Sequence, residues 1–511
     1  MYIEANTKYI PMSLHLYNTL TRTTERFKPI RQDEVKVYYC GPTPYNYAHI
    51  GNLRAYLNSD FVVRSLRFLG YKVKTVMNIT DIDDKTIRDS QKSRKTLQEF
   101  TEFYAGEFLT DLSKLGIRHA DTIAPISTLI TDMRKMIQWL FDKWYAYLAE
   151  DGSIYYSVSK FRKYGELAHL DMSGMISSVR INNDEYDKDQ VADFALWKAY
   201  DSESDGPNKW TIEITLDGKT QKLDGRPGWH IECSACNYRF FGEQIDIHMG
   251  GIDNLFPHHQ NEVAQTEAYT GKQFSKYWMH GGHLLVDNKK MAKSAGNFYT
   301  LRDVVEKQSD TAPELIYRGF RLMALQNQYR ENFNFTFERL GAAVNTIRGL
   351  DEMMKRLGRY IAKLPETSEE RTGRGKLKFH EISREFRDNQ QYFMQEFVDK
   401  LEDDFDTVSA MTIVFEFQGY VNSGIDEELF SPLEARSLVD LMRSWNEVIG
   451  IFDFSLLESE SLPADIQALA LDRYDAKMAK NWAEADRIRD ELASKWWKMI
   501  DEKNGWRVEK I

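Results

Sequence analysis

The chain has very little cysteine, with three residues among 511. So small and odd a set is unlike the disulfide framework of a secreted domain, and we expect these side chains to remain thiols in a reducing compartment. No apolar run is long enough to cross a bilayer, and the first residues, MYIEANTKYIPM, lack the basic and apolar regions of a signal peptide. The sequence therefore predicts a cytoplasmic protein that does not span a membrane.

An excess of positive charge is also missing, because the formal net charge is -11. This argues against a surface uniformly suited to nucleic acid, so any RNA contact must come from local clusters of Lys and Arg. With 42% hydrophobic and 28% charged residues, the composition is that of an ordinary globular protein. The length exceeds what one core supports and predicts roughly three or four domains.

The first half of the chain predicts an α/β fold. VKVYYC at 35–40 reads as a strand, a helical pattern begins at Ala48, and YKVKTVMNI at 71–79 returns to strand. Such a βαβ unit implies a parallel sheet, with ligands at the carboxyl ends of the strands. QIDIHMGG at 244–251 reads as a further strand of the same sheet.

The remaining segments predict helices, an insertion and two joints. Residues 97–148 look helical, 151–222 look polar and irregular like an insertion, and nearly everything past Thr300 looks helical. PETSEERTGRGK at 365–376 and SESLPADI at 459–466 have the composition of linkers.

Two of the cysteines suggest a metal site. Cys233 and Cys236 fall three apart on one face of a predicted helix, as a zinc pair would. Two further ligands are needed, and Cys40 at the end of the first strand is a candidate. His258 and Glu262, four apart on a second helix, offer an imidazole and a carboxylate. A site with Cys236 in place of Glu262 is chemically possible, and a lone cysteine is more often a small core side chain.

Two other segments suggest a nucleotide site. PTPYNYAHIGN at 42–52 leads into a helix whose N-terminus can receive a phosphate beside His49 and Gly51. DNKKMAKSAGN at 287–297 is a loop with three lysines, Lys289, Lys290 and Lys293. Such a run is usually a solvated face, but over a triphosphate it would neutralise the charge of departing pyrophosphate.

Taken together, these segments resemble the cysteinyl-tRNA synthetases, a family of class I aminoacyl-tRNA synthetases. The matching motifs are, in chain order, CGPTPYNYAHIGN, NITDIDDK, GRPGWHIECSA, HMGGID, FPHHQNE and KMAKS. The resemblance covers nearly the whole chain. It implies an α/β fold in which a Rossmann-like parallel-sheet catalytic domain with an inserted connective region precedes a helical bundle and a small C-terminal anticodon-binding domain.

The resemblance also implies domain bounds. They are 13–115 and 223–300 for the two halves of the catalytic domain, 116–222 for the connective region, 301–345 for a stem-contact region that follows the lysine loop, 346–458 for the bundle and 459–511 for anticodon recognition.

Individual residues take their expected roles from the resemblance. The zinc ligands are Cys40, Cys233, His258 and Glu262, which leaves Cys236 out. The catalytic groups are His49, Lys290 and Lys293, and the ATP contacts are His49, Gly51, Asn52, Asp253 and Lys293. The amino-acid contacts are Gly41, Thr80 and Trp229. The chain departs from the family pattern where Asn52 replaces the last histidine of the His-Ile-Gly-His signature, where Ala292 replaces a serine in the lysine loop, and at Met249 and Gln260.

The implied activity is a cysteine-tRNA ligase. Cysteine would react with ATP, in the presence of Mg²⁺, to give cysteinyl-adenylate, and would then pass to the terminal ribose of cysteine tRNA. One Zn²⁺ per chain would distinguish the substrate thiol from the hydroxyl of serine, since an apolar pocket separates close isosteres by only ~1–3 kcal/mol. The acceptor end and the anticodon of the tRNA are the expected RNA contacts, and the protein is expected to be a monomer that does not bind membranes.

Basic residues of the C-terminal half predict where the RNA would bind. One cluster is Lys355, Arg356, Arg359, Lys363, Arg371, Arg374, Lys376 and Lys378; the other is Arg487, Arg489, Lys495, Lys498, Lys503, Arg507 and Lys510, interleaved with Trp496, Trp497 and Trp506. A solvated face is the alternative for any one of them. Three alternatives to the whole activity remain open: a ligase that joins cysteine to an amino sugar, a zinc hydrolase, and a non-catalytic RNA-binding module.

Overall fold

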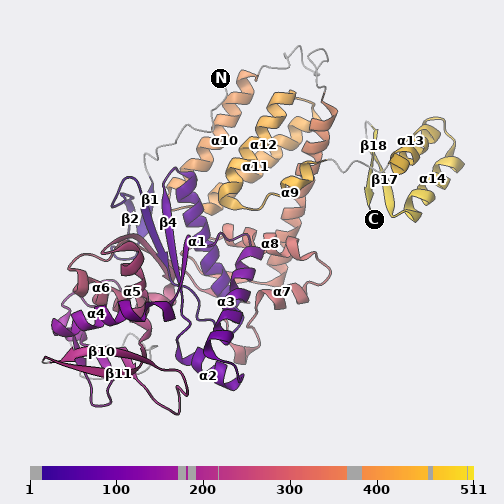
Figure 1. Cartoon of the computed structure of the whole chain (residues 1–511). Coiled ribbons are helices and arrows are strands. Elements are labelled where there is room, and N and C mark those ends of the chain that lie inside the picture. Colours follow the sequence, from indigo (N-terminus) through magenta and orange to yellow (C-terminus); the bar gives the residue numbers. More distant parts are fainter. Residues whose placement is uncertain are drawn as a thin grey trace. The chain divides into compact units, whose positions relative to one another are not determined.

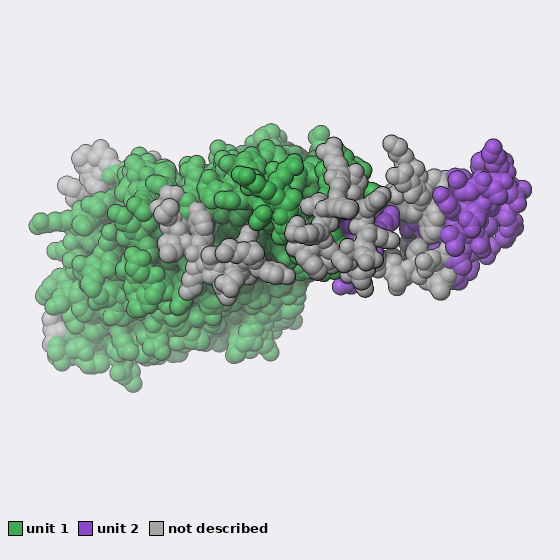
Figure 2. Space-filling view, turned by 90° about the horizontal axis from the view of Figure 1, so that it is seen from above, with its two compact units in different colours: residues 1–353, 365–453 green, residues 354–364, 454–511 purple. Residues whose placement is uncertain are grey.

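The computed structural model describes residues 14–170, 180–181, 192–216, 218–364, 382–458, 464–502 and 505–510 (Figure 1). The chain divides into two compact units (Figure 2). The first contains residues 1–353 and 365–453, and the second contains residues 354–364 and 454–511. The predicted linker at 365–376 lies outside the described residues, as do 459–463 of the second joint.

A five-stranded parallel sheet forms the centre of the first unit, with the strand order β13-β12-β3-β4-β5. Its strands are β3 (Val35–Tyr39), β4 (Val73–Ile79), β5 (Thr122–Pro125), β12 (Ile245–Gly251) and β13 (Ser275–Gly281). Most residues of β3, β4 and β12 are buried on both faces, as their apolar sequences require. The predicted α/β fold with a parallel sheet is therefore confirmed.

Three helices begin at the carboxyl edge of this sheet. They are α1 (Ile50–Phe68), which joins β3 to β4, α5 (Trp229–Phe241), which precedes β12, and α6 (Gln260–Thr270), which joins β12 to β13. A helix between two parallel strands starts where the first strand ends, so the N-termini of α1 and α6 meet at one edge. This is the edge at which the sequence predicts ligands.

The residues between the two halves of the sheet form a second, mostly antiparallel sheet. Its path is β10-β11-β9-β7-β6, and the short β8 (Arg180–Ile181) pairs with β9. The strands are β6 (Ala146–Leu148), β7 (Ile154–Tyr156), β9 (Asp193–Ala199), β10 (Trp210–Leu216) and β11 (Lys219–Pro227). The prediction of irregular structure across 151–222 is wrong for β7, β9, β10 and the first part of β11. β10 is half-buried, with polar residues alternating on its exposed side, and such a strand has a polar composition.

The prediction of continuous helix over 97–148 is also wrong in part. The segment contains α3 (Leu97–Lys114) and α4 (Ile130–Asp142), but β5 and β6 interrupt it. α2 (Asp84–Lys92) precedes α3, and an N-terminal hairpin of β1 (His15–Asn18) and β2 (Thr23–Arg26) lies beside β13.

Helices follow the sheet as predicted, with short strands between them. The helices are α7 (Leu301–Lys307), α8 (Pro313–Leu325), α9 (Phe337–Lys363), α10 (Arg384–Glu402), α11 (Thr407–Asp426) and α12 (Pro432–Ile449). The strands are β14 (Leu284–Val286), β15 (Lys289–Lys290) and β16 (Phe333–Phe335). α10, α11 and α12 pack through aromatic side chains, for example Phe397 and Phe417 against Trp445.

Buried arginines attach the last turn of α12 to the α/β part of the first unit. Arg321 on α8, which is 1% exposed, donates to the carbonyl of Ile449 at 2.6 Å and to Asp60 Oδ2 at 2.7 Å. Arg64 pairs with the same Asp60 oxygen and donates to the carbonyl of Glu447. These bonds satisfy carbonyls that a helix end leaves unpaired, so α12 is fixed directly to α1, which carries Asp60 and Arg64.

The second unit has its own small core. It contains α13 (Ala464–Met478), α14 (Trp482–Ser494) and a hairpin of β17 (Trp497–Glu502) and β18 (Gly505–Lys510), packed around Ile466, Ile488 and Met499. The prediction that nearly everything past Thr300 is helical is wrong for this hairpin. None of the described helices is both long enough and apolar enough to cross a membrane.

Candidate active site

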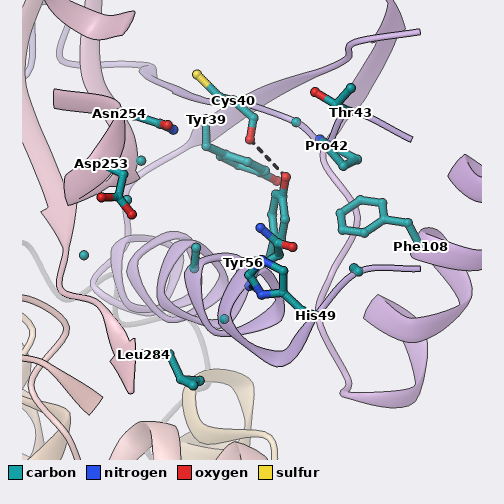
Figure 3. Close-up of a pocket in the computed structure, with 18 of the residues that line it drawn as sticks. Tyr39, Cys40, Pro42, Thr43, His49, Tyr56, Phe108, Asp253, Asn254 and Leu284 are labelled. Carbon is teal, nitrogen blue, oxygen red and sulfur yellow. Dashed lines mark hydrogen bonds between the residues drawn. The ribbon is translucent and has the colours of Figure 1, made fainter. Parts of the chain in front are cut away.

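A cavity of about 450 Å³ opens at the carboxyl edge of the parallel sheet. Figure 3 shows how its walls are built: Cys40 follows β3, His49 caps α1, Tyr56 lies on α1, Phe108 lies on α3, and Asp253 follows β12. The Tyr56 hydroxyl donates to the carbonyl of Cys40 at 3.2 Å, which ties α1 to the end of β3 (Figure 3). The cavity thus joins the two regions in which the sequence predicts a metal site and a nucleotide site.

The four predicted metal ligands come together at the end of the cavity. Cys40 follows β3 and Cys233 lies on α5. Glu262 lies in the first turn of α6, and His258 lies four residues earlier, in the turn that leads into this helix. One donor atom of each lies within 4.8 Å of the others. The two Sγ atoms are 3.8 Å apart, and His258 Nε2 is 2.9 Å from Glu262 Oε1. Three of the side chains are buried and Cys40 is half-buried, so the group is reached from the cavity side.

Mutual electrostatics favour charged forms in this group although burial opposes them. Burial would raise the pKa of Glu262, but His248 and His258 lower it to about 2. Burial would also raise the pKa of Cys233, but contacts with Cys40 and His258 lower it to about 6. The pKa of His258 is raised to about 10 by Cys233 and Glu262, against the effect of burial. Cys40 is the exception, because its contact with Cys233 and its burial raise its pKa. The site therefore stabilises negative charge on Cys233 and Glu262.

Two further histidines adjoin these ligands, and sequence reasoning did not find them. His248 Nε2 is 2.8 Å from Glu262 Oε2, and His259 Nε2 is 3.6 Å from Cys40 Sγ. Together with Cys40 and Glu262 they form a second group whose donor atoms lie within 4.8 Å of one another. Cys236 is buried on α5 and belongs to neither group.

A network centred on Asn78 supports the wall next to the metal ligands. Asn78 Oδ1 accepts from Gly41 N at 2.8 Å and from the Tyr38 hydroxyl at 2.9 Å. Because a backbone N–H can only donate, the amide orientation is fixed, and Asn78 Nδ2 donates to Thr80 Oγ1 at 2.9 Å. A Cβ at position 41 would lie 1.5 Å from the carbonyl oxygen of Asn78, so only glycine fits there. Trp229 stacks on His258 with ring centroids 4.1 Å apart.

The opposite end of the cavity has the predicted nucleotide residues. The His49 side chain caps α1 by accepting from the backbone N–H of Asn52, whose own side chain is exposed. Gly51 faces the lysine loop so closely that a Cβ there would lie 2.7 Å from Met291 Cε and 2.9 Å from His49 Nδ1. The loop therefore rests on the start of α1.

The lysine loop also contacts the segment after β12. Lys290 Nζ is 3.8 Å from Asp253 Oδ1, and His283 Nδ1 is 3.3 Å from the other oxygen of this carboxylate. All three side chains line or border the cavity. Lys293 lies in a short helical turn at 293–295, and its side chain lies outside the described part of the structure.

The comparisons with known proteins agree with this arrangement. The family model for the "tRNA synthetases class I (C) catalytic domain" matches residues 26–345, and the DALR domain model matches residues 396–453. The cysteine-tRNA ligase of Chlamydia muridarum is 41% identical over 98% of this chain and 100% of its own length. That of Protochlamydia amoebophila is 39% identical over 98% of both chains. The chain belongs to the cysteine-tRNA ligase family.

Solved class I synthetases share the fold of this family member. The methionyl-tRNA synthetase of Mycobacterium tuberculosis bound by methionyl-adenylate has a TM-score of 0.56 at 12% identity, covering 83% of this chain and 92% of that one. A LeuRS–tRNA–LeuAMS complex from Agrobacterium radiobacter has a TM-score of 0.58 at 12% identity, with coverage of 85% and 86%. The class I fold, with its helical C-terminal region, is thereby confirmed.

The residues that the family resemblance assigns to substrates lie around one cavity in this cysteine-tRNA ligase relative. The lining includes Cys40, Gly41, His49, Gly51, Asn52, Thr80, Trp229, Cys233, Asp253 and Lys290. His258 and Glu262 lie behind this surface, in contact with Cys233 and Cys40.

Proposed function

We propose that the protein is a cysteine-tRNA ligase. It joins cysteine to ATP, releasing pyrophosphate, and then transfers cysteine from the adenylate to the terminal ribose of cysteine tRNA. The main support is that one cavity has thiol, imidazole and carboxylate donors at one end and a capped helix N-terminus with a lysine loop at the other. An amino acid recognised through its thiol can then present its carboxylate to the α-phosphorus of ATP.

The donor set at Cys40, Cys233, His258 and Glu262 fits one Zn²⁺. Two sulfurs, a ring nitrogen and a carboxylate oxygen are ligands that zinc accepts. The His258 Nε2 atom is buried and has no aligned hydrogen bond among the described residues, although Glu262 Oε1 is only 2.9 Å away. Such convergence of two electron-pair donors suits a cation between them. When bound, zinc would supply a thiophilic Lewis acid that favours a thiolate over a hydroxyl.

Neighbouring histidines would hold the zinc ligands in position. His248 engages the second oxygen of Glu262, and His230 Nδ1 lies 2.9 Å from His258 Nδ1. Partners of this kind fix the orientation and tautomer of ligands, and their removal weakens metal binding.

Other residues of the chain bind cysteine and ATP and hold their reacting groups in position. Gly41, Thr80 and Trp229 form the amino-acid pocket, while His49, Gly51, Asn52 and Asp253 contact ATP. Lys290 and Lys293, together with the start of α1, neutralise the charge that develops as pyrophosphate leaves. Mg²⁺, when bound with ATP, would supply further positive charge. No protein nucleophile is required, so catalysis is mainly positioning and charge stabilisation.

The remaining parts of the chain would bind the tRNA. We assign contacts with the tRNA stem to the segment 301–345, and anticodon contacts to 459–511 beyond the bundle at 346–458. We also propose a cytoplasmic monomer, which size-exclusion chromatography with light scattering would test. The amino-sugar ligase has no use for an anticodon-reading unit. Four protein ligands leave less room on zinc for the activated water of a hydrolase than the three ligands that are usual in such enzymes.

Two measurements on one protein preparation test the proposal. Zinc content should be one per chain, and ATP–pyrophosphate exchange should depend on cysteine and not on serine. Charging of cysteine tRNA would then exclude the amino-sugar ligase. Exchange that continues at full rate after the metal is removed with a chelator would contradict the role of zinc, and an absence of exchange with metal present would contradict the ligase itself.

A further inference from the structure

Three exposed cations lie at the end of α2 and in the turn that leads to α3. Lys92, Arg94 and Lys95 are all exposed, and no carboxylate in the described part of the chain lies within ion-pair distance of any of them. In a protein of net charge -11, such a cluster is a local exception. Its charge is available to an external anion.

The basic cluster predicted near the C-terminus differs in this respect. Arg487 pairs with Glu484 and Glu491, and Lys495 pairs with Asp465. These cations are neutralised within their own unit. A run of lysines and arginines in the sequence is therefore a weak indication of an RNA site. Cations that make no ion pair in the folded chain are a stronger one.

Aromatic side chains connect the basic turn to the cavity. Lys95 Nζ lies 5.2 Å from the centroid of the Phe103 ring, and Phe103 is 45% exposed. Phe103 contacts Tyr104 and Tyr47, with ring centroids 5.1 Å and 6.4 Å away, and these two rings are 5.4 Å apart. Tyr47 and Tyr104 line the cavity, so the aromatic surface runs from the basic turn to its mouth.

Arg302 holds the inner part of this surface in place. Its guanidinium carbon lies 3.9 Å from the centroid of the Tyr47 ring, and the same side chain pairs with Glu107 and lies 3.6 Å from Asp111. Because the two carboxylates fix Arg302, the Tyr47 ring keeps its orientation at the mouth. The outer ring, Phe103, remains accessible.

This combination fits an unpaired nucleic acid strand. Cations attract phosphates, and exposed aromatic rings stack on bases, but only bases that are not stacked within a duplex. The reaction proposed for the cavity ends on the terminal ribose of a tRNA, so an unpaired strand must pass its mouth.

We propose that a basic-aromatic rim binds the unpaired end of the tRNA acceptor strand as it enters the cavity. The rim consists of Tyr47, Lys92, Arg94, Lys95, Phe103 and Tyr104. This inference rests on the proposed ligase function, but it assigns the contact to α2, α3 and the loop before α1 and not to the C-terminal basic clusters.

Phe103→Ala tests the aromatic part of the rim. We expect kcat/KM for tRNA in aminoacylation to fall roughly five- to 150-fold, the loss expected for one stacked base. Cysteine-dependent pyrophosphate exchange should not change, because that reaction needs no tRNA. Trp144→Ala is the matched control, since Trp144 is 76% exposed in the turn after α4 and does not line the cavity.

Replacing Lys92, Arg94 and Lys95 together by Ala tests the basic part. If each cation contacts one phosphate of a single strand, the slope of log kcat/KM for tRNA against log salt should fall in magnitude by about 2. The control replaces Lys135, Lys143 and Lys160 by Ala. These are exposed and do not line the cavity, so this variant should keep the slope of the unmodified protein.

A binding assay separates the rim from the ligase activity. Fluorescence anisotropy with a short RNA hairpin that has an unpaired 3′ tail, and with the same hairpin made blunt, should show that the full-length protein prefers the tail and that both rim variants lose the preference. If Phe103→Ala also loses pyrophosphate exchange, the variant with Lys92, Arg94 and Lys95 replaced is the deciding test of the rim. Its three replaced side chains are exposed, so their removal should not disturb the fold. Unchanged aminoacylation and a retained preference for the tail in that variant overturn the rim. Failure of exchange in the unmodified protein would overturn the ligase alone.

Discussion

Asn78 is the residue through which we expect the amino-acid pocket to keep its shape. Its side-chain amide accepts a hydrogen bond from Gly41 N and donates one to Thr80 Oγ1, and these two partners belong to different segments of the pocket wall. The same amide also accepts from the Tyr38 hydroxyl. Asn78→Ala should therefore raise KM for cysteine in pyrophosphate exchange. KM for ATP should stay the same, because the network does not reach His49 or Gly51.

The structure sets the size of this effect. A neutral hydrogen bond contributes about 0.5–1.5 kcal/mol net, so three bonds predict a loss of about 1.5–4.5 kcal/mol in the free energy of unfolding. Two of the three partners face the substrate pocket. Losing their orientation costs about 1–3 kcal/mol in binding, which is roughly a five- to 150-fold decrease in kcat/KM for cysteine.

A double-mutant cycle with Thr80→Val shows whether Asn78 acts through Thr80. We expect a coupling energy of about 0.5–3 kcal/mol, since the second substitution removes a bond that the first has already broken. Tyr38→Phe is the control, because it removes one bond to Asn78 and leaves the two pocket bonds intact. Additive effects in the cycle, or KM values for ATP and cysteine that rise together, would refute this reasoning. Zinc content measured on each variant shows whether the nearby Cys233 is disturbed.

Three other substitutions have definite expected outcomes. His258→Ala should lower zinc retention, measured by metal analysis after dialysis, together with cysteine affinity; full affinity without metal would contradict the site. Gly51→Ala should raise KM for ATP at least severalfold in pyrophosphate exchange, because its Cβ displaces Met291, whereas an unchanged value would mean that the lysine loop shifts without cost. Asp60→Asn should lower the free energy of unfolding in denaturant titrations by about 3–5 kcal/mol, because it leaves the buried Arg321 without its counter-charge. Unaltered stability would show that the backbone carbonyls alone hold that arginine.

The parallel sheet and the ends of its strands could be predicted from sequence because their signals are local. β3 and β4 are rich in apolar and β-branched residues, and α1 begins at a histidine cap after a turn rich in glycine and proline. The spacing of His258 and Glu262 likewise predicts a shared helix face, and their side chains are in contact in the structure.

Other parts of the site depend on contacts between distant segments. His248 on β12 meets Glu262 on α6 in the folded chain, and Asn78 on β4 meets Gly41 because the sheet aligns β3 with β4. No spacing within one segment indicates such pairs. The strands of the second sheet were missed because β10 alternates buried and exposed residues, which makes its composition polar.

The anchoring of α12 on α1 limits how this protein could be re-engineered. The 19-residue helix α1 is capped by His49 beside the cavity. Farther along, it carries Asp60 and Arg64, which hold the end of α12. A foreign RNA-binding module grafted in place of α10–α12 would need to present a helix end of its own to Arg321 and Arg64. A chimera without such a helix end would leave two buried cations without these carbonyl partners. We expect the catalytic half of that chimera to lose solubility, whichever tRNA the new module binds.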